Sequence, residues 1–236
     1  MSLKAVIWDF DGTIADSNQK NYAITKELFC QGMGLDISLI AALSSYDDYT
    51  TALNRYSNWR SLYAEGFGIA SERIDEAGDL WHDYQVKMQV RTPVFPGLRS
   101  VFDRIHPVPQ AIVSQNSKDN IQNCLIDEQC DHYFSKIIGY QDVPYSAQKP
   151  DPTGLILAMK ELLGSRMGED GFVIYVGDHA TDLETAQNAQ EWAQSEQLSL
   201  KVHGFRVGFE RTADKDAAHC TEPAQLEQLI AECAGL

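Results

Sequence analysis

The stretch VIWDFDGTI, residues 6–14, gives the first indication of the fold class. A short apolar run ends in Asp9 and Asp11, and Gly12 follows, which permits a sharp turn and a close backbone approach. A continuous apolar run bounded by a turn signal is typical of a buried strand. Two carboxylates at the end of such a strand need a cation nearby, so the stretch predicts a buried strand that ends at a candidate metal site.

Apolar runs of the same kind recur along the chain, with helical patterns between them. They cover residues 4–8, 110–113, 134–138, 172–176 and, more weakly, 200–207. This alternation predicts an α/β fold, a Rossmann-like open parallel sheet with helices on both faces. In such a sheet the chemistry gathers beyond the carboxyl ends of the strands. The residues that follow each run are therefore the candidates for a functional site.

One long segment, residues 18–92, interrupts this alternation. It contains no convincing strand, and its helical spacing is clearest over residues 74–88. Pro93, Pro96 and Gly97 then mark a linker before the next helix. We expect two domains: an α/β core of residues 1–17 and 93–236, and an inserted all-helical domain of residues 18–92.

Two later positions carry groups that can bind a phosphate. Ser114 ends the second apolar run, and its hydroxyl can donate a hydrogen bond to a phosphate oxygen. Lys149 stands directly before a helix that Asp151 is expected to cap, with Pro152 at its first position. Capping explains Asp151 and Pro152 but not Lys149, which could neutralise a carboxylate and a phosphoryl group together.

The fourth strand end is Gly177-Asp178, and Thr181 and Glu184 form the expected capping box of the helix that follows. Asp182 then lies in the first helical turn, where its charge suits the helix dipole. The four regions together bring four carboxylates, one hydroxyl and one lysine to one edge of the sheet. This set meets the needs of phosphoryl transfer: metal ligands, a nucleophile, a proton carrier and donors for the equatorial oxygens.

The sequence resembles the haloacid dehalogenase superfamily, in its capped, phosphoglycolate phosphatase-like branch. Residues 9–13 are similar to the first motif of that family, Ser114 to its second, Lys149 to its third and residues 178–182 to its fourth. The resemblance spans essentially the whole chain and implies that residues 18–92 form a helical cap domain. Relatives often end the helix after the fourth motif with an Ala-Gly pair, whereas Asn188 continues it here, so we expect a longer helix.

The resemblance also implies a role for each motif residue. Asp9 would attack phosphorus to form an aspartyl phosphate, and Asp11 would protonate the leaving group and later activate water. Ser114 and Lys149 would hold the phosphoryl oxygens. The implied activity is that of a phosphatase acting on a small-molecule phosphomonoester.

Mg²⁺ is the cofactor that the resemblance implies. It would be bound by Asp9, by the backbone carbonyl of Asp11 and by Asp178, with Asp182 ligating through water or orienting the other ligands. Dehalogenases and phosphonate-cleaving members lack the acid at the position of Asp11, so the resemblance favours phosphate chemistry.

Two alternatives stay open: a phosphomutase, whose family members keep the acid, and a non-catalytic protein that binds a phosphate ligand. The expected partner is a small phosphorylated metabolite, such as phosphoglycolate, a sugar phosphate or a nucleotide. The cap would close over the core, exclude water and set specificity. Arg55, Trp59, Arg60 and Tyr63 are candidates for substrate contacts there, although such residues commonly occupy solvated faces or cores.

Composition and charge limit the other partners. The formal net charge of −15 and the lack of a basic run disfavour nucleic acid. The apolar runs are far shorter than the roughly 20 residues needed to cross a bilayer, so no membrane span is expected. Five cysteines without paired or metal-ligand spacing, and an N-terminus that runs straight into the first strand, favour the cytoplasm. No repeat is apparent, and the oligomeric state, monomer or dimer, stays open.

Overall fold

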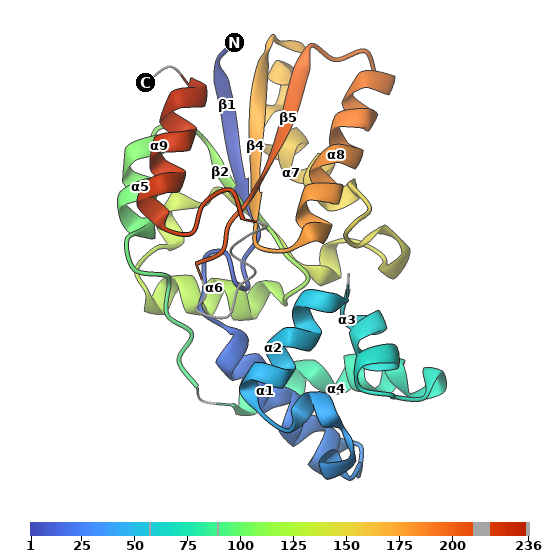
Figure 1. The fold of residues 1–236 in the computed structure, drawn as a ribbon. Coiled ribbons are helices and arrows are strands. Elements are labelled where there is room, and N and C mark those ends of the chain that lie inside the picture. The colour runs from blue at the N-terminus through green and yellow to red at the C-terminus, as the bar shows by residue number, and fades with distance from the viewer. Residues whose placement is uncertain (57, 89, 210–217, 235–236) are drawn as a thin grey trace. The chain divides into compact units, whose positions relative to one another are not determined.

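The structure is a computed structural model that describes residues 1–56, 58–88, 90–209 and 218–234. Its contacts divide the chain into two compact units, Met1–Ala15 with Pro93–Leu236 and Asp16–Thr92. The first unit combines a sheet with helices, and the second contains helices and no strand among its described residues (Figure 1). Within the described ranges, we find no helix with the length and apolar character that a membrane span requires.

Five parallel strands form the sheet of the first unit, in the order β3-β2-β1-β4-β5. They are β1 Leu3–Trp8, β2 Gln110–Val113, β3 Lys136–Ile138, β4 Gly171–Gly177 and β5 Leu200–Arg206. The predicted open parallel sheet is confirmed. Strand β3 begins at Lys136 rather than at residue 134, because the N–H of Phe134 still closes the turn of Asp131–Tyr133.

The strand register brings three carboxyl ends to one level. Trp8 at the end of β1 pairs with Ile112 of β2 and with Val176 of β4. The chain moves from β1 to β2 and β3 on one side, and β4 and β5 lie on the other side of β1. Such a reversal of strand order leaves a crevice in which open α/β sheets bind ligands. The tips of β1 and β4 are therefore the expected place for a site.

Both faces of the sheet are buried under helices. These helices are α5 Leu98–Ile105, α6 Lys118–Asp127, α7 Thr153–Leu163, α8 Ala180–Ser195 and α9 Pro223–Ala234. Val6 and Trp8 belong to the apolar cluster that includes α5, α6 and α9, whereas Ala5 and Ile7 pack with α7 and α8 on the opposite face (Figure 1). A strand covered on both faces needs an apolar residue at every position, which accounts for the unbroken run in β1.

The starts and lengths of two helices bear on the sequence predictions. Helix α7 begins at Thr153, with Pro152 at the cap position, so the prediction that Asp151 is the N-cap is wrong by one residue. The Asp151 carboxylate still accepts the N–H of Thr153, at 2.9 Å, so it satisfies one of the free donors of the first turn. Helix α8 continues through Ser195, which confirms the expected extension.

The second unit is built from short helices around an aromatic core. Its elements are α1 Asn18–Glu27, η1 Leu28–Gly32, η2 Ile37–Leu39, η3 Ala41–Leu43, α2 Tyr46–Arg55, α3 Trp59–Ser61, η4 Leu62–Gly66, η5 Ser71–Arg73 and α4 Ile74–Lys87. Tyr63 is buried in this core, with its ring centroid 5.1 Å from that of Phe29. Arg60 pairs with Asp75 and lies 4.7 Å from the ring of Trp59. Tyr63 therefore has a packing role, and Arg60 is already paired within the unit.

Two segments of the second unit share a sequence pattern and a backbone. LFCQGMGL, residues 28–35, matches LYAEGFGI, residues 62–69, and each begins with a five-residue π-helix. In both segments a glycine in the left-handed region follows, Gly34 with φ 65° and Gly68 with φ 68°. Only glycine adopts this conformation without strain, which explains why both helices end in the same way. The pair shares one local helix-ending pattern and does not form a periodic repeat along the chain.

Candidate active site

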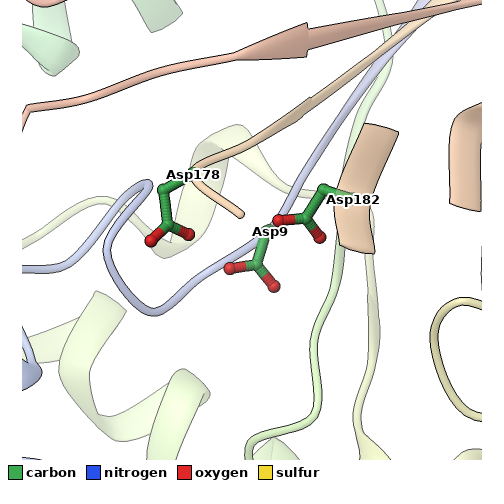
Figure 2. A group of neighbouring side chains, drawn as sticks. All are labelled: Asp9, Asp178 and Asp182. Atoms are coloured by element: carbon green, nitrogen blue, oxygen red, sulfur yellow. The ribbon is translucent and has the colours of Figure 1, made fainter. Parts of the chain in front are cut away.

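Three carboxylates converge at the tips of β1 and β4. One oxygen each of Asp9, Asp178 and Asp182 lies within 4.8 Å of the other two, and Figure 2 shows the three groups side by side. Asp9 directly follows β1, and its N–H donates to the carbonyl of Val176 at 2.7 Å, which ties it to the end of β4. Asp9 and Asp182 are buried, and Asp178 is half-buried. Three oxygen ligands at this spacing could hold a divalent cation.

Lys149 lies between two of these carboxylates. Its Nζ donates to Asp9 Oδ1 at 2.5 Å and to Asp182 Oδ1 at 2.7 Å. The Tyr175 hydroxyl lies 3.1 Å from the same Asp182 oxygen, and the Lys149 ammonium lies 5.3 Å from the Tyr175 ring. The lysine is thus held in place by two ion pairs in a nearly dry environment, with a side-chain exposure of 8%.

The electrostatics of this group are dominated by burial. Burial raises the pKa of Asp9 to about 7. The charge of Lys149 lowers this pKa, and the charge of Asp182 raises it. Burial also opposes the charged form of Lys149, but attraction to Asp182 and Asp9 outweighs this effect, so the pKa of Lys149 is well above its usual value. When both carboxylates are ionised, the group of Asp9, Asp182 and Lys149 carries a net negative charge.

Asp178 is held by the loop after β1 and by the end of β5. Thr13 Oγ1 donates to Asp178 Oδ1 at 3.1 Å, and Arg206 Nε donates to the Asp178 backbone carbonyl at 2.9 Å. Gly12 has φ 75°, and a Cβ atom there would overlap the Asp178 carboxylate. The glycine of the opening stretch therefore permits both the turn and the close approach of the loop to Asp178.

Helix α8 begins differently from the prediction. Its N-cap is His179, whose Nδ1 accepts the N–H of Thr181 at 3.3 Å, and Asp182 Oδ2 accepts the N–H of His179 at 3.1 Å. The expected capping box of Thr181 and Glu184 is therefore wrong, because the N-cap lies two residues earlier, at His179, and Asp182 takes the reciprocal position. Asp182 thus has one oxygen on the helix start and the other on Lys149.

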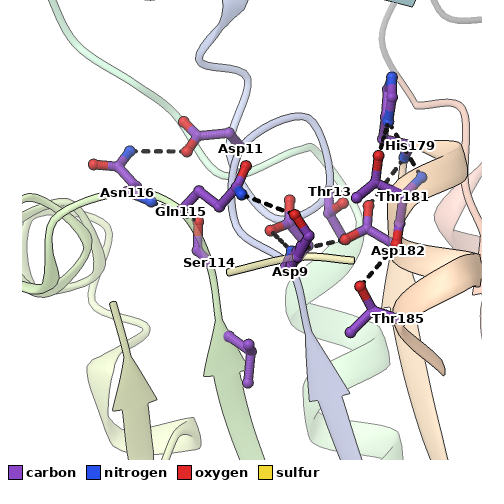
Figure 3. Close-up of polar contacts among 12 residues, drawn as sticks. Asp9, Asp11, Thr13, Ser114, Gln115, Asn116, His179, Thr181, Asp182 and Thr185 are labelled. Carbon is purple, nitrogen blue, oxygen red and sulfur yellow. Dashed lines mark hydrogen bonds and ion pairs between the residues drawn. The ribbon is translucent and has the colours of Figure 1, made fainter. Parts of the chain in front are cut away.

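Asp11 and Ser114 lie at the same edge but outside the carboxylate group. Ser114 Oγ accepts the N–H of Asn116 at 3.1 Å, and Asn116 Nδ2 donates to Asp11 Oδ2 at 2.8 Å. Figure 3 shows the hydrogen bond from Asn116 to Asp11, with Ser114 close to both residues and Asp9 at the tip of the preceding strand. The structure therefore brings Asp9, Lys149 and Asp182 into direct contact and links Ser114 to Asp11 through Asn116.

Several residues of the site carry no strong signal in the sequence. Tyr175 is one more apolar-type position of β4, and Asn116 is an ordinary turn residue after β2. His179 could have been identified as a cap from its place three residues before Asp182, which is the spacing of a capping box. Arg206 ends the most weakly predicted strand and has no local feature that marks it.

Comparison with known proteins places the chain in a family. A sequence profile described as haloacid dehalogenase-like hydrolase matches residues 6–191. PpaX of Caldanaerobacter subterraneus subsp. tengcongensis, named as a candidate pyrophosphatase, is 25% identical over 195 residues, which are 80% of this chain and 79% of that protein.

Solved structures share the fold over almost the entire chain. A candidate phosphoglycolate phosphatase from Lactobacillus plantarum superposes with a TM-score of 0.72 at 18% identity, covering 97% of this chain and 100% of its own. CbbY from Rhodobacter sphaeroides, solved in complex with phosphate, superposes with a TM-score of 0.63 at 17% identity, covering 92% of each chain. With the matching profile and the acidic strand tips, the chain belongs to the haloacid dehalogenase-like hydrolase family.

Proposed function

We propose that this chain is a Mg²⁺-dependent phosphatase that hydrolyses a small-molecule phosphomonoester. The observation that carries the proposal is the 2.5 Å contact between Lys149 Nζ and Asp9, beside two further carboxylates. An isolated carboxylate repels a phosphoryl dianion, whereas one that faces an ammonium and a cation site can approach it. The phosphate bound by CbbY, which has the same fold, supports a phosphate ligand.

In the proposed reaction, an Asp9 oxygen forms a bond to phosphorus while the bond from phosphorus to the leaving oxygen breaks. Asp11 donates a proton to that oxygen, so the products of this step are an alcohol and an aspartyl phosphate. Asp11 then takes a proton from a water molecule that attacks phosphorus, and inorganic phosphate leaves Asp9 free. Ser114 and Lys149 are the proposed donors to the nonbridging oxygens.

The residues present fit a divalent cation. The ligand atoms are all oxygens, which Mg²⁺ prefers, and the raised pKa of Asp9, about 7, reflects a buried negative charge that a cation would relieve. We propose the side chains of Asp9 and Asp178 and the backbone carbonyl of Asp11 as ligands. When bound, Mg²⁺ would screen the charge between the nucleophile and the phosphoryl group.

Asp182 has a different proposed role. Its two oxygens already accept bonds from Lys149 and from the N–H of His179. We therefore propose that Asp182 orients Lys149 and the surrounding ligands rather than binding the cation directly. We also propose that residues 18–92 form the cap domain that selects a small phosphorylated metabolite.

Phosphate release from 4-nitrophenyl phosphate tests the proposal. We expect release that requires Mg²⁺, stops with EDTA, and falls by at least about a thousandfold in Asp9→Asn, because the nucleophile is lost. Asp127→Asn is the matched control, since Asp127 is an exposed aspartate of α6, and it should keep full activity.

The outcomes separate the alternatives. Undiminished release by Asp9→Asn would refute the nucleophile assignment. Transfer of labelled phosphate to a sugar with little net release would indicate a phosphomutase instead. Phosphate binding without release from any of a broad panel of phosphomonoesters would indicate a binding protein.

A further inference from the structure

Asn116 is a buried residue of the turn after β2, and both ends of its side-chain amide make hydrogen bonds. The residue is 7% exposed. Its Oδ1 accepts the backbone N–H of Ser117 at 2.7 Å and the side-chain amide of Asn120 at 3.3 Å. Its own backbone N–H donates to Ser114 Oγ at 3.1 Å. The turn therefore fixes the position of the Asn116 amide.

The same contacts fix which way the amide points. A backbone N–H can only donate, so the atom that faces Ser117 must be the amide oxygen. The NH₂ group must then point to the other side, where it donates to Asp11 Oδ2 at 2.8 Å. The orientation follows from the hydrogen-bond partners, so the amide is a fixed donor aimed at the Asp11 carboxyl group (Figure 3).

The two oxygens of Asp11 have different surroundings. Oδ2 accepts the bond from Asn116, whereas Oδ1 is buried and has no hydrogen-bond partner among the described residues. An oxygen that already accepts an N–H is a poor place for a transferable proton, while an unpartnered buried oxygen needs a partner. One oxygen of the carboxyl group is thus hydrogen-bonded, and the other, Oδ1, is buried without a partner among the described residues.

We infer that Asn116 is a positioning residue for Asp11: it holds Oδ2 so that Oδ1 delivers the proton to the leaving oxygen. The inference rests on the proposed function, because it concerns the acid of that reaction. In the step concerned, the O–H bond at Oδ1 breaks, the proton passes to the leaving oxygen, and Oδ2 keeps its bond from Asn116 throughout. Asn116 itself touches no reacting atom.

Leaving-group dependence tests the inference, because it reports on proton donation and not on folding. Benzyl phosphate has a leaving alkoxide that needs a proton, whereas 4-nitrophenyl phosphate has a stable leaving phenolate, and both carry a single six-membered ring. For Asn116→Ala we expect kcat/KM to fall by about 10- to 100-fold with benzyl phosphate and by less than about threefold with 4-nitrophenyl phosphate.

Two further variants complete the experiment. Asn116→Asp keeps an acceptor for Ser117 and Asn120 but offers no amide donor to Asp11, so it should show the same selective loss if Asn116→Ala does not fold. Asn123→Ala is the matched control: Asn123 is an exposed asparagine of α6, the helix that follows the turn of Asn116, and its removal should change kcat/KM with neither substrate.

Each result decides something. An equal loss with both substrates would assign Asn116 a merely structural role, and no loss with either would show that Asp11 needs no support, so both results overturn the inference. A wild-type protein that releases phosphate from neither substrate would instead overturn the proposed function. A selective loss with benzyl phosphate alone supports the positioning role.

Discussion

In metal-free protein, Asp9→Asn should stabilise the fold more at pH 8 than at pH 5. Burial raises the pKa of Asp9 from 3.8 to about 7, although Lys149 lowers it. Between these values the folded state holds a proton that the unfolded state has released, so the free energy of unfolding falls as pH rises. Each pH unit in this window costs about 1.4 kcal/mol, so the step from pH 5 to pH 8 should cost the wild type about 2 to 3 kcal/mol at this residue.

Urea unfolding in EDTA at pH 5, 6, 7 and 8 measures this effect as the difference between the free energies of unfolding of the two proteins. Groups other than Asp9 titrate in both proteins, so most of their contribution cancels. Asp127→Asn should give a difference that does not vary with pH, since Asp127 is exposed. A constant difference between wild type and Asp9→Asn across this range would refute the argument that burial holds the proton on Asp9.

The remaining predictions concern Lys149 and Gly12. Lys149→Met should lower the free energy of unfolding of the metal-free protein by about 3 to 5 kcal/mol, because Asp9 and Asp182 lose the ammonium between them. Urea unfolding at pH 8 measures this loss, and an unchanged unfolding midpoint would contradict the prediction. Gly12→Ala should cut phosphate release by more than about tenfold, because the new Cβ displaces Asp178. Gly34→Ala is the control, because Gly34 has a similar φ of 65° but open space where the Cβ would lie. Equal losses of phosphate release in both variants would show that backbone strain alone is responsible.

The capping of α8 shows where local patterns stop being sufficient. The sequence offers two overlapping capping boxes two residues apart, His179 with Asp182 and Thr181 with Glu184. Serine and threonine are the commoner caps, so the second was the better local prediction. The first forms because Asp182 must also reach Lys149, which comes from the segment before α7. Asp182 therefore takes part in the local cap and in a tertiary contact at the same time, and the tertiary contact is what the local pattern does not contain.

The amino-acid pattern alone is enough to predict the fold class, since the apolar runs that become β1, β2 and β4 and the helical segment 18–92 are set by local spacing. It also indicated which strand ends carry acids. Which side chains meet depends on the folded arrangement: Lys149 lies 140 positions from Asp9, and Asn116 lies 105 positions from Asp11. The physical reason is that periodicity reports burial along one element, whereas contacts across the sheet edge depend on strand order and register, which no local pattern encodes.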